Sequence, residues 1–249
     1  LHSGGQVRLY NLIRELSDRH EITLVCEKRV NQTAVDVKEV EKICKKVVTV
    51  TRRKQWSIKN ILKSVASPHS FLVTGHTHPE MQEKIREELE NNSFDLIHVE
   101  TFYVMQNLPK TLPNPPLSGR ESVVSFPDKG RLGGVLPIVL VEHNIEHQVY
   151  RKFVDRAPAP LRPLLSLDIA KIKREEEEAW KSATALVAVS EEDRGVMKRA
   201  GFDAALVSNG VDLDKFRTNP STSLRKEKKI LFIGDFKWIQ NQDSAKFII

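Results

Sequence analysis

The sequence lacks the features that define several protein classes. Its two cysteines, Cys26 and Cys44, form no CxxC pair, and we expect buried free thiols of a cytoplasmic protein. No apolar run approaches the roughly 20 residues that cross a bilayer. No GxGxxG motif follows a strand pattern, which disfavours a dinucleotide dehydrogenase. The remaining composition, 40% hydrophobic and 29% charged, is that of a globular protein with a substantial core.

The balance of charge is positive. A net charge of +6 and a pI near 9.2 favour an anionic partner. Nucleic acid is a poor candidate for that partner, because aromatic residues make up 6% of the chain and no nucleic-acid-binding module is present. Most cations are dispersed among acids, but the stretch 52–63 holds five cations and no acid.

This basic stretch has two interpretations. Drawn as a helix, it places Lys59 and Lys63 on one side and gathers apolar side chains on the other, namely Trp56, Ile58, Ile61, Leu62 and Val65. Cations beside such a face suit peripheral contact with the anionic inner face of a membrane through 52–65. An amphipathic helix packed on the protein's own sheet is the commoner structure, and it is the favoured interpretation.

Short apolar strands alternate with amphipathic helices along most of the chain. Strand patterns cover 21–26, 46–50, 94–100, 137–142, 183–190 and 205–212. Helical patterns cover 7–19, 34–45, 79–91, 145–154, 161–181 and a segment that starts after Ser190 and ends at Gly201. This alternation predicts an α/β fold with a doubly wound, Rossmann-like parallel sheet, whose ligands bind beyond the carboxyl ends of the strands.

The same patterns divide the chain into domains. We expect residues 1–217 to form one domain that lacks its first strand, 218–228 to form a polar linker, and 229–249 to begin a second βα unit with a strand at 229–235. The apolar residues of the segment 117–136 follow neither the helical nor the strand period. It is a mobile lid or inserted loop, or else a non-native insertion that leaves the sheet intact.

Seven local motifs occur in an order that resembles the family 4 glycosyltransferases. They are GG-x2-R-x2-NLI-x2-L, HEITLVC, FDLIHVE, VLVEHNIE, ALVAVSEED, VSNGVDLDKF and FIGDFKWIQN. The resemblance covers nearly the whole chain except 117–136. It implies the N-terminal, acceptor-side half of a GT-B fold and the start of the donor domain. The activity implied is the retaining transfer of a sugar from a nucleotide-sugar to a saccharide or lipid-linked acceptor, in polysaccharide or glycolipid assembly.

The resemblance also implies that no cofactor or metal is needed, because the nucleotide-sugar is a co-substrate. We expect the 249-residue chain to be inactive alone, since most of the donor domain is absent. Two alternatives stay open: a non-catalytic sugar- or lipid-binding module of the same fold, and another GT-B enzyme such as a sugar-nucleotide epimerase.

Two candidate sites lie at the start of the chain and after the strand 137–142. Gly4 and Gly5 precede a helix, so bare backbone N–H groups and the helix dipole can face an anion or sugar oxygens; a tight turn alone explains them equally well. By resemblance, His143 lies near the transferred sugar as a hydrogen-bond partner, with Glu142 beside it.

Asn144 completes the polar cluster at this strand end. It is a good N-cap for the helix 145–154 and a second candidate for substrate contact. Glu146 and His147 are expected to be exposed helix residues.

Further candidates follow the next two strands. Ser190 and Glu191 start a helix, and a capping role for Ser190 is favoured over contact with substrate. Asn209 and Gly210 resemble the family's turn before the interdomain linker, with Gly210 expected at positive φ.

Gly234 and Lys237 are the candidates for the donor phosphates. Both assignments come from the resemblance, and a cation such as Lys237 can neutralise phosphate charge. The acidic run 175–178 is expected to be a solvated helix face. His76 and His78 are expected to be loop residues, and metal binding there is improbable because no third ligand lies near.

Overall fold

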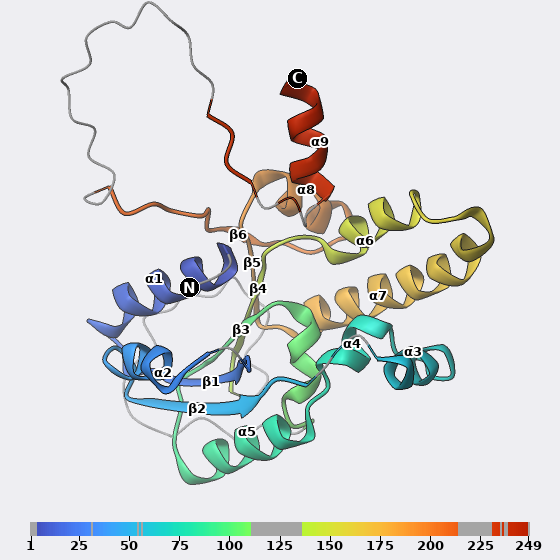
Figure 1. Cartoon of the computed structure of the whole chain (residues 1–249). Coiled ribbons are helices and arrows are strands. Elements are labelled where there is room, and N and C mark those ends of the chain that lie inside the picture. Colours follow the sequence, from blue (N-terminus) through green and yellow to red (C-terminus); the bar gives the residue numbers. More distant parts are fainter. Residues whose placement is uncertain are drawn as a thin grey trace, which may run out of the picture. The chain divides into compact units, whose positions relative to one another are not determined.

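The computed structural model describes residues 4–30, 32–53, 55, 57–110, 136–213, 231–234, 236 and 239–248 (Figure 1). These residues form two compact units, 1–210 and 211–249. The predicted insertion 117–136 (apart from its last residue), the linker 218–228 and Lys237 lie outside the described residues.

The first unit contains two parallel sheets. One pairs β1 (Thr23–Lys28) with β2 (Lys46–Thr51). The other has the order β3-β4-β5-β6, with β3 (Ile97–Glu100), β4 (Ile138–Glu142), β5 (Ala185–Ala188) and β6 (Ala205–Leu206). Every pairing is parallel. The prediction of an α/β fold with parallel strands is confirmed, whereas the described strands form two sheets rather than one.

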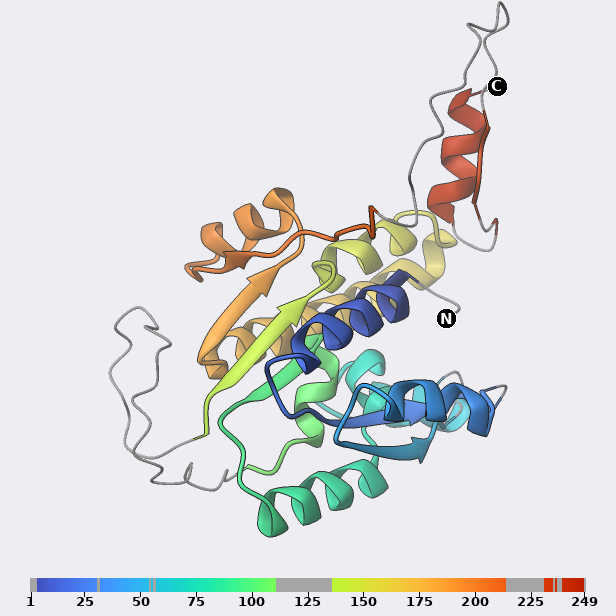
Figure 2. The same cartoon turned by 90° about the vertical axis from the view of Figure 1, so that its left-hand side faces the viewer.

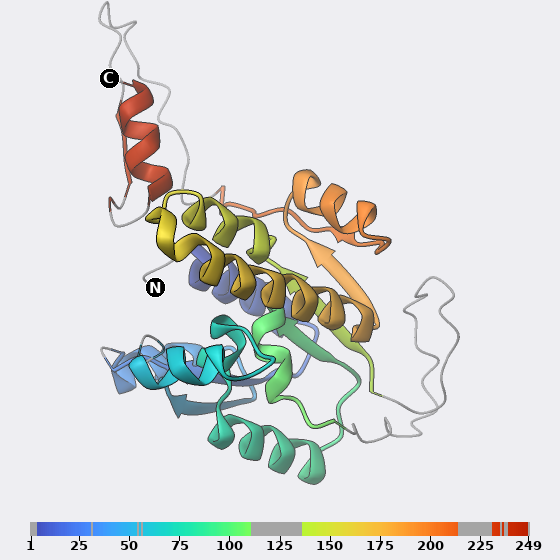
Figure 3. The same ribbon diagram turned by 90° about the vertical axis from the view of Figure 1, so that its right-hand side faces the viewer.

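Helices connect and cover these strands. They are α1 (Gly4–Ser17), α2 (Ala34–Glu41), α3 (Ile58–Val65), α4 (Phe71–His76), α5 (Pro79–Asn91), α6 (Glu146–Val154), α7 (Arg162–Ser182) and α8 (Glu191–Arg199), with 3-10 turns η1 (Phe102–Asn107) and η2 (Ala159–Leu161). Neither α4 nor η1 was predicted from the sequence, because six residues are too few to show a helical period. Figures 2 and 3 show α1 on one face of the four-stranded sheet and α7 on the other.

The core of this unit lies between β4 and α7. Leu140 and Ile172 are fully buried, and the Trp180 ring packs edge-on against Phe202 with ring centroids 5.5 Å apart. Burial of each large apolar side chain contributes about 1.5–3 kcal/mol. The apolar run at 138–141 therefore becomes the central strand because it is covered on both faces.

The smaller sheet is less covered. Every residue of β1 keeps partial exposure, including Cys26. Cys44 is buried, and both cysteines are free thiols. Burial, with the nearby Cys44 and Glu27, raises the pKa of Cys26 to about 11, so this thiol stays protonated and unreactive at neutral pH. The prediction of free thiols is confirmed for both residues, whereas the predicted burial holds for Cys44 and only partly for Cys26.

The ends of α8 follow the sequence signals. The Ser190 hydroxyl accepts a hydrogen bond from the Asp193 N–H at 3.1 Å. At the other end Gly201 has φ 89°, and Phe202 N–H donates to the Met197 carbonyl at 2.9 Å. These are the predicted N-cap and left-handed C-terminal glycine.

The second unit is described over 211–213, 231–234, 236 and 239–248, with one helix, α9 (Ile239–Ile248). Residues 231–234 form no strand, so that part of the predicted strand 229–235 is wrong. A lone extended segment needs a neighbour to complete its hydrogen bonds, and these residues have none in a sheet. Across the described parts of both units, no helix has the length and apolar content to span a membrane.

Candidate functional site

The candidate site lies where β3 and β4 end. Parallel pairing sets Glu100 beside Val141, so the side chain of Glu100 shares a face with the position two residues further on, His143. On this face α1 begins: a Cβ built on Gly5 would lie 3.5 Å from His143 Nδ1. Two predicted motifs far apart in the sequence are therefore adjacent in the structure.

Strand alternation sends the neighbours Glu142 and His143 to opposite faces of the sheet. His143 meets the start of α1, and its side chain is 21% exposed. Glu142 turns towards α7, where its Oε1 accepts a hydrogen bond from Trp180 Nε1 at 2.9 Å. Only His143 of this pair has surface open to a ligand.

The Glu142 carboxyl is fully buried. Its Oε2 has no hydrogen-bond partner in the part of the chain that the structure describes. Burial, reinforced by the charge of Glu176, raises the pKa of Glu142 well above its ordinary value, a shift that favours the neutral carboxyl. The residue expected to contact substrate is therefore a buried core acid behind the site.

His143 is held by Glu100. The Nε2 atom of His143 hydrogen-bonds one oxygen of this carboxylate, and His98 Nε2 bonds the other at 2.8 Å. Burial alone would raise the pKa of Glu100, but the hydrogen bonds and charges of the two imidazoles lower it to about 2. Glu100 is therefore ionised at neutral pH and can only accept hydrogen bonds.

Backbone strain occurs next to Glu100. Thr101 has φ 75° and is the one residue other than glycine with positive φ in the described chain. Its N–H donates to the Val141 carbonyl at 2.8 Å, which extends the pairing of β3 with β4 past the strand end. A β-branched residue in this region costs about 1–3 kcal/mol, and such strain is concentrated at functional sites.

The second turn of α1 adds a cation. Arg8 Nη2 donates to the Val207 carbonyl at 3.4 Å, just beyond β6. Arg8 belongs to the GG-x2-R motif and was not among the predicted site residues. Its position one turn after Gly5 was the available signal, because residues three apart share a helix face.

Asn144 does not cap α6, so the predicted cap is wrong. The N-cap is Ile145, which has no polar side chain. The buried carboxylate of Glu176 takes the role from α7: it accepts the Glu146 N–H at 2.7 Å and bonds His147 Nδ1 at 2.5 Å. A carboxylate at a helix N-terminus satisfies free N–H groups and complements the dipole.

Glu146 and His147 were expected to be exposed helix residues, but both are partly buried. Burial and the charge of Glu176 raise the pKa of Glu146 to about 7, against the opposing effects of His143 and Asn144. An acid with a pKa near neutrality close to His143 is a further candidate for the site, one that the sequence did not indicate.

Half of the acidic run 175–178 also departs from prediction. Glu176 is fully buried and Glu175 is 8% exposed, with its carboxylate accepting the Ser70 N–H at 3.1 Å. The signal was present in the helical period, because 175 and 176 lie on the face defined by Ile172 and Ala179.

The remaining strand-end candidates lie at the same edge of the sheet. Ser190 caps α8, and the exposed Glu191 pairs with Arg194 at 3.2 Å. Asn209 and Gly210 are exposed. Gly210 does not have the positive φ expected of it, since among the described glycines only Gly201 does.

In the second unit, Gly234 is closely packed. A Cβ at this position would lie 3.0 Å from the Phe232 ring and 3.1 Å from the Asn241 side chain. The contacts explain a glycine here by close approach of neighbours. Its predicted role in binding phosphate remains a prediction.

The two histidines expected in a loop are structural. His76 ends α4, and its Nδ1 donates to the Leu72 carbonyl at 2.8 Å; burial lowers its pKa to about 4 despite this bond. The buried His78 caps α5, accepting the Met81 N–H at Nδ1 (3.4 Å) and bonding the Thr51 carbonyl through Nε2 (3.0 Å). Among the described residues, no group of three or more His, Cys, Asp or Glu side chains is arranged so that it could hold a metal ion.

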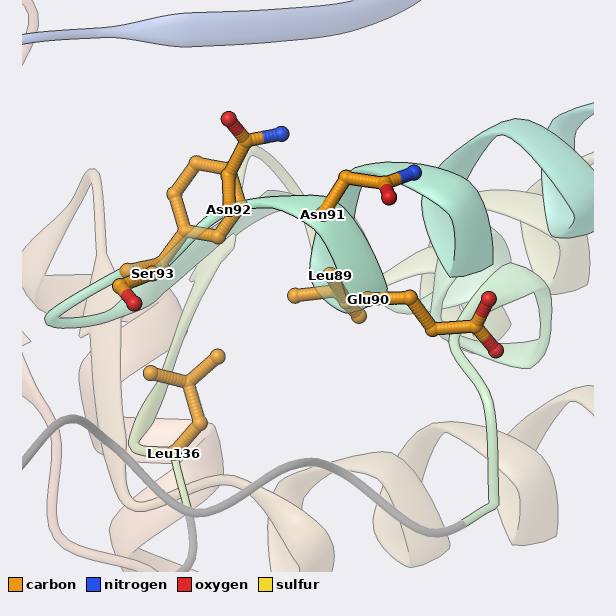
Figure 4. Close-up of a pocket in the computed structure, with 7 residues that line it drawn as sticks. Leu89, Glu90, Asn91, Asn92, Ser93 and Leu136 are labelled. Carbon is orange, nitrogen blue, oxygen red and sulfur yellow. The ribbon is translucent and has the colours of Figure 1, made fainter.

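A hollow in the described part of the chain lies elsewhere. It measures about 230 Å³ and is bordered by the last turn of α5, the residues after it and Leu136 (Figure 4). Phe94 and Leu136 precede β3 and β4, so the hollow is at the amino ends of the strands, opposite to His143. Ligands of parallel sheets bind at the other edge, and we assign this hollow no role.

Comparison with known proteins identifies no relative: no family model matches the chain, and a search of curated proteins finds no significant match.

Proposed function

We propose that the chain is the acceptor-side part of a retaining glycosyltransferase that uses a nucleotide-sugar donor. The observation that carries the proposal is the meeting of Gly5 with His143 at the carboxyl edge of a parallel sheet. The free N–H groups of a helix N-terminus suit an anion, and the imidazole beside them suits a hydroxyl. Together they suit the diphosphate and sugar of a nucleotide-sugar.

Other features of the edge support the same ligand. Arg8 adds positive charge in the second turn of α1, and the carboxyl of Glu142 is fully buried on the other face of the sheet. In this scheme His143 contacts the transferred sugar or the charge that develops on it. The donor would be held mainly by the second domain, for which Gly234 and Lys237 are the candidates in this chain.

The proposal is tested in the full-length protein with UDP-, GDP- and ADP-linked sugars, by measuring nucleotide release and analysing products. We expect His143→Ala to lower kcat by about 10²–10⁴-fold, as loss of a group acting in the transition state does, with little effect on the free energy of unfolding. His20→Ala, at an exposed position after α1, is the matched control. Loss of stability and turnover in equal measure would make His143 structural.

The product analysis separates the alternatives. A nucleotide-sugar that binds but is not consumed would indicate a binding module. A converted sugar that stays attached to its nucleotide would indicate an epimerase.

We also propose that the first unit contacts an anionic membrane surface through α3. Ser64 anchors this helix: its hydroxyl donates to Asp168 at 3.2 Å, and Lys171 Nζ donates to its carbonyl at 2.7 Å. Apolar side chains of α3 nevertheless stay exposed, with Ile61, Leu62 and Val65 at 43%, 64% and 54% exposure. This apolar face is not packed on the sheet, which favours the membrane interpretation of 52–65.

Flotation with vesicles of phosphatidylglycerol or phosphatidylcholine tests this contact. We expect binding to anionic vesicles alone, and a weakening of about fivefold in Lys63→Gln, since each surface cation contributes about 1 kcal/mol. The single change Leu62→Ser should weaken vesicle binding more than the change at Lys63 does. Val30→Ser, at a 90% exposed position, serves as the control. Equal binding to both lipids, or none, would refute the contact.

A further inference from the structure

The arrangement around Glu100 goes beyond the choice of His143 as the reacting imidazole. Both oxygens of this carboxylate are engaged by Nε2 atoms, one from His98 and one from His143. Glu100 is 16% exposed at its side chain, so the bonds are partly shielded from water. The carboxylate therefore fixes the orientation of the His143 ring more firmly than a solvated partner would.

This contact also fixes the protons of the ring. An ionised carboxylate cannot donate, so the hydrogen bond requires the proton on His143 Nε2. In neutral imidazole Nδ1 is then the bare nitrogen. Nδ1 is the atom that faces Gly5 and the start of α1, 3.5 Å from the position of a Cβ there.

We propose that Glu100 is a positioning residue, which holds His143 in the Nε2–H tautomer and presents Nδ1 as a hydrogen-bond acceptor to a ligand hydroxyl at the α1 N-terminus. On the proposed function, that hydroxyl belongs to a sugar. Each oxygen of Glu100 already accepts a hydrogen bond from an imidazole, and in this proposal the carboxylate acts through His143.

The strained residue after Glu100 agrees with this role. Thr101 keeps φ 75° while its N–H bonds the Val141 carbonyl at 2.8 Å. This bond ties the end of β3 to β4 two residues before His143. A cost in backbone strain at this point is consistent with a carboxylate whose placement matters.

The first test needs no activity. Long-range ¹H–¹⁵N correlation spectra of this chain, at a pH where histidines are neutral, report the tautomer of His143, assigned by its loss in His143→Gln. We expect Nε2–H in the wild type and a mixture of tautomers in Glu100→Ala. Glu100→Gln, whose amide oxygen can still accept, should keep the wild-type tautomer, as should His98→Gln.

A wild-type ring with its proton on Nδ1, or a tautomer unaffected by Glu100→Ala, would overturn the proposal. Should Glu100→Ala fail to fold, Glu100→Leu retains the side-chain volume without an acceptor and replaces it. Circular dichroism establishes that each variant is folded before its spectra are compared.

The second test uses the full-length protein and the same sugar nucleotides. We expect Glu100→Ala to lower kcat by about 10–100-fold, as loss of an outer-shell partner does, with donor KM little changed. The double variant with His143→Ala should be no slower than His143→Ala alone, because Glu100 acts only through His143. Losses that multiply would overturn the positioning role. Absence of turnover with every donor counts against the proposed function, while the tautomer experiment still decides the role of Glu100.

Discussion

At the scale of single residues, Glu142 and His143 show how one strand end divides a polar cluster. Adjacent positions on a strand face opposite sides, so the buried acid and the accessible imidazole belong to different environments. The sequence could predict the strand end and its polar cluster. It could not predict that Trp180, from a helix nearly 40 residues later, would cover Glu142.

Glu146 gives this cluster a measurable pH dependence. Its pKa is raised from about 4.5 to about 7, so the folded state holds this proton more tightly than the unfolded chain. Below pH 4.5 both states are protonated and nothing is lost. Between pH 4.5 and 7 only the unfolded chain ionises, so the stability of the wild type declines as pH rises through this window.

Glu146→Gln cannot ionise and should escape the decline. We expect the difference in the free energy of unfolding between Glu146→Gln and the wild type to grow by about 1–2 kcal/mol from pH 4.5 to 8. Full linkage would give about 1.36 kcal/mol per pKa unit, and the expected change is smaller because the side chain is not fully buried. Urea denaturation across this range measures it. Glu178→Gln, exposed on α7, should show no trend; a flat difference for Glu146→Gln would contradict the shift.

At the scale of elements, α6 depends on α7 for its start. Ile145 offers no capping side chain, and Glu176 supplies the acceptor from another helix. Local signals in the sequence favoured Asn144 as the cap. A cap that arrives through tertiary packing leaves no local signal, and the helical face of Ile172 and Ala179 was the only indication that position 176 is buried.

Glu176→Ala should therefore destabilise the first unit. It removes a helix cap and leaves the Glu146 N–H without its partner, at a combined cost of about 2–4 kcal/mol. Denaturation followed by tryptophan fluorescence measures the change. Glu178→Ala, two positions along on the exposed side, should stay within about 0.5 kcal/mol of the wild type. Similar small effects for both would show that the cap is dispensable.

At the scale of the whole first unit, the strands were predictable and their assembly was not. An apolar run in the sequence indicated each strand, and the helices between the strands indicated parallel pairing. The division into two sheets depends on which edges meet, and β1 and β3 share no described pairing. No single segment contains that information.

This division predicts unequal local stability. The residues of β1 are all partly exposed, whereas Leu140 and Val141 in β4 are at most 1% exposed. We expect amides of β4 to exchange with solvent only on global unfolding, and those of β1 and β2 to exchange through smaller openings, faster by at least about tenfold. Hydrogen-exchange mass spectrometry resolves the two sheets; uniform protection would show one cooperative unit.

The contact between Gly5 and His143 has a thermodynamic consequence. It closes a loop that spans most of the first unit, and α1, which brings Gly5 there, buries only Ile13 among its residues. The site therefore exists only while α1 is docked. A ligand that bridges the two residues would bind the docked state alone, and mass action would make it a clamp on the helix: at 100 times its Kd it would add about 2.7 kcal/mol against undocking.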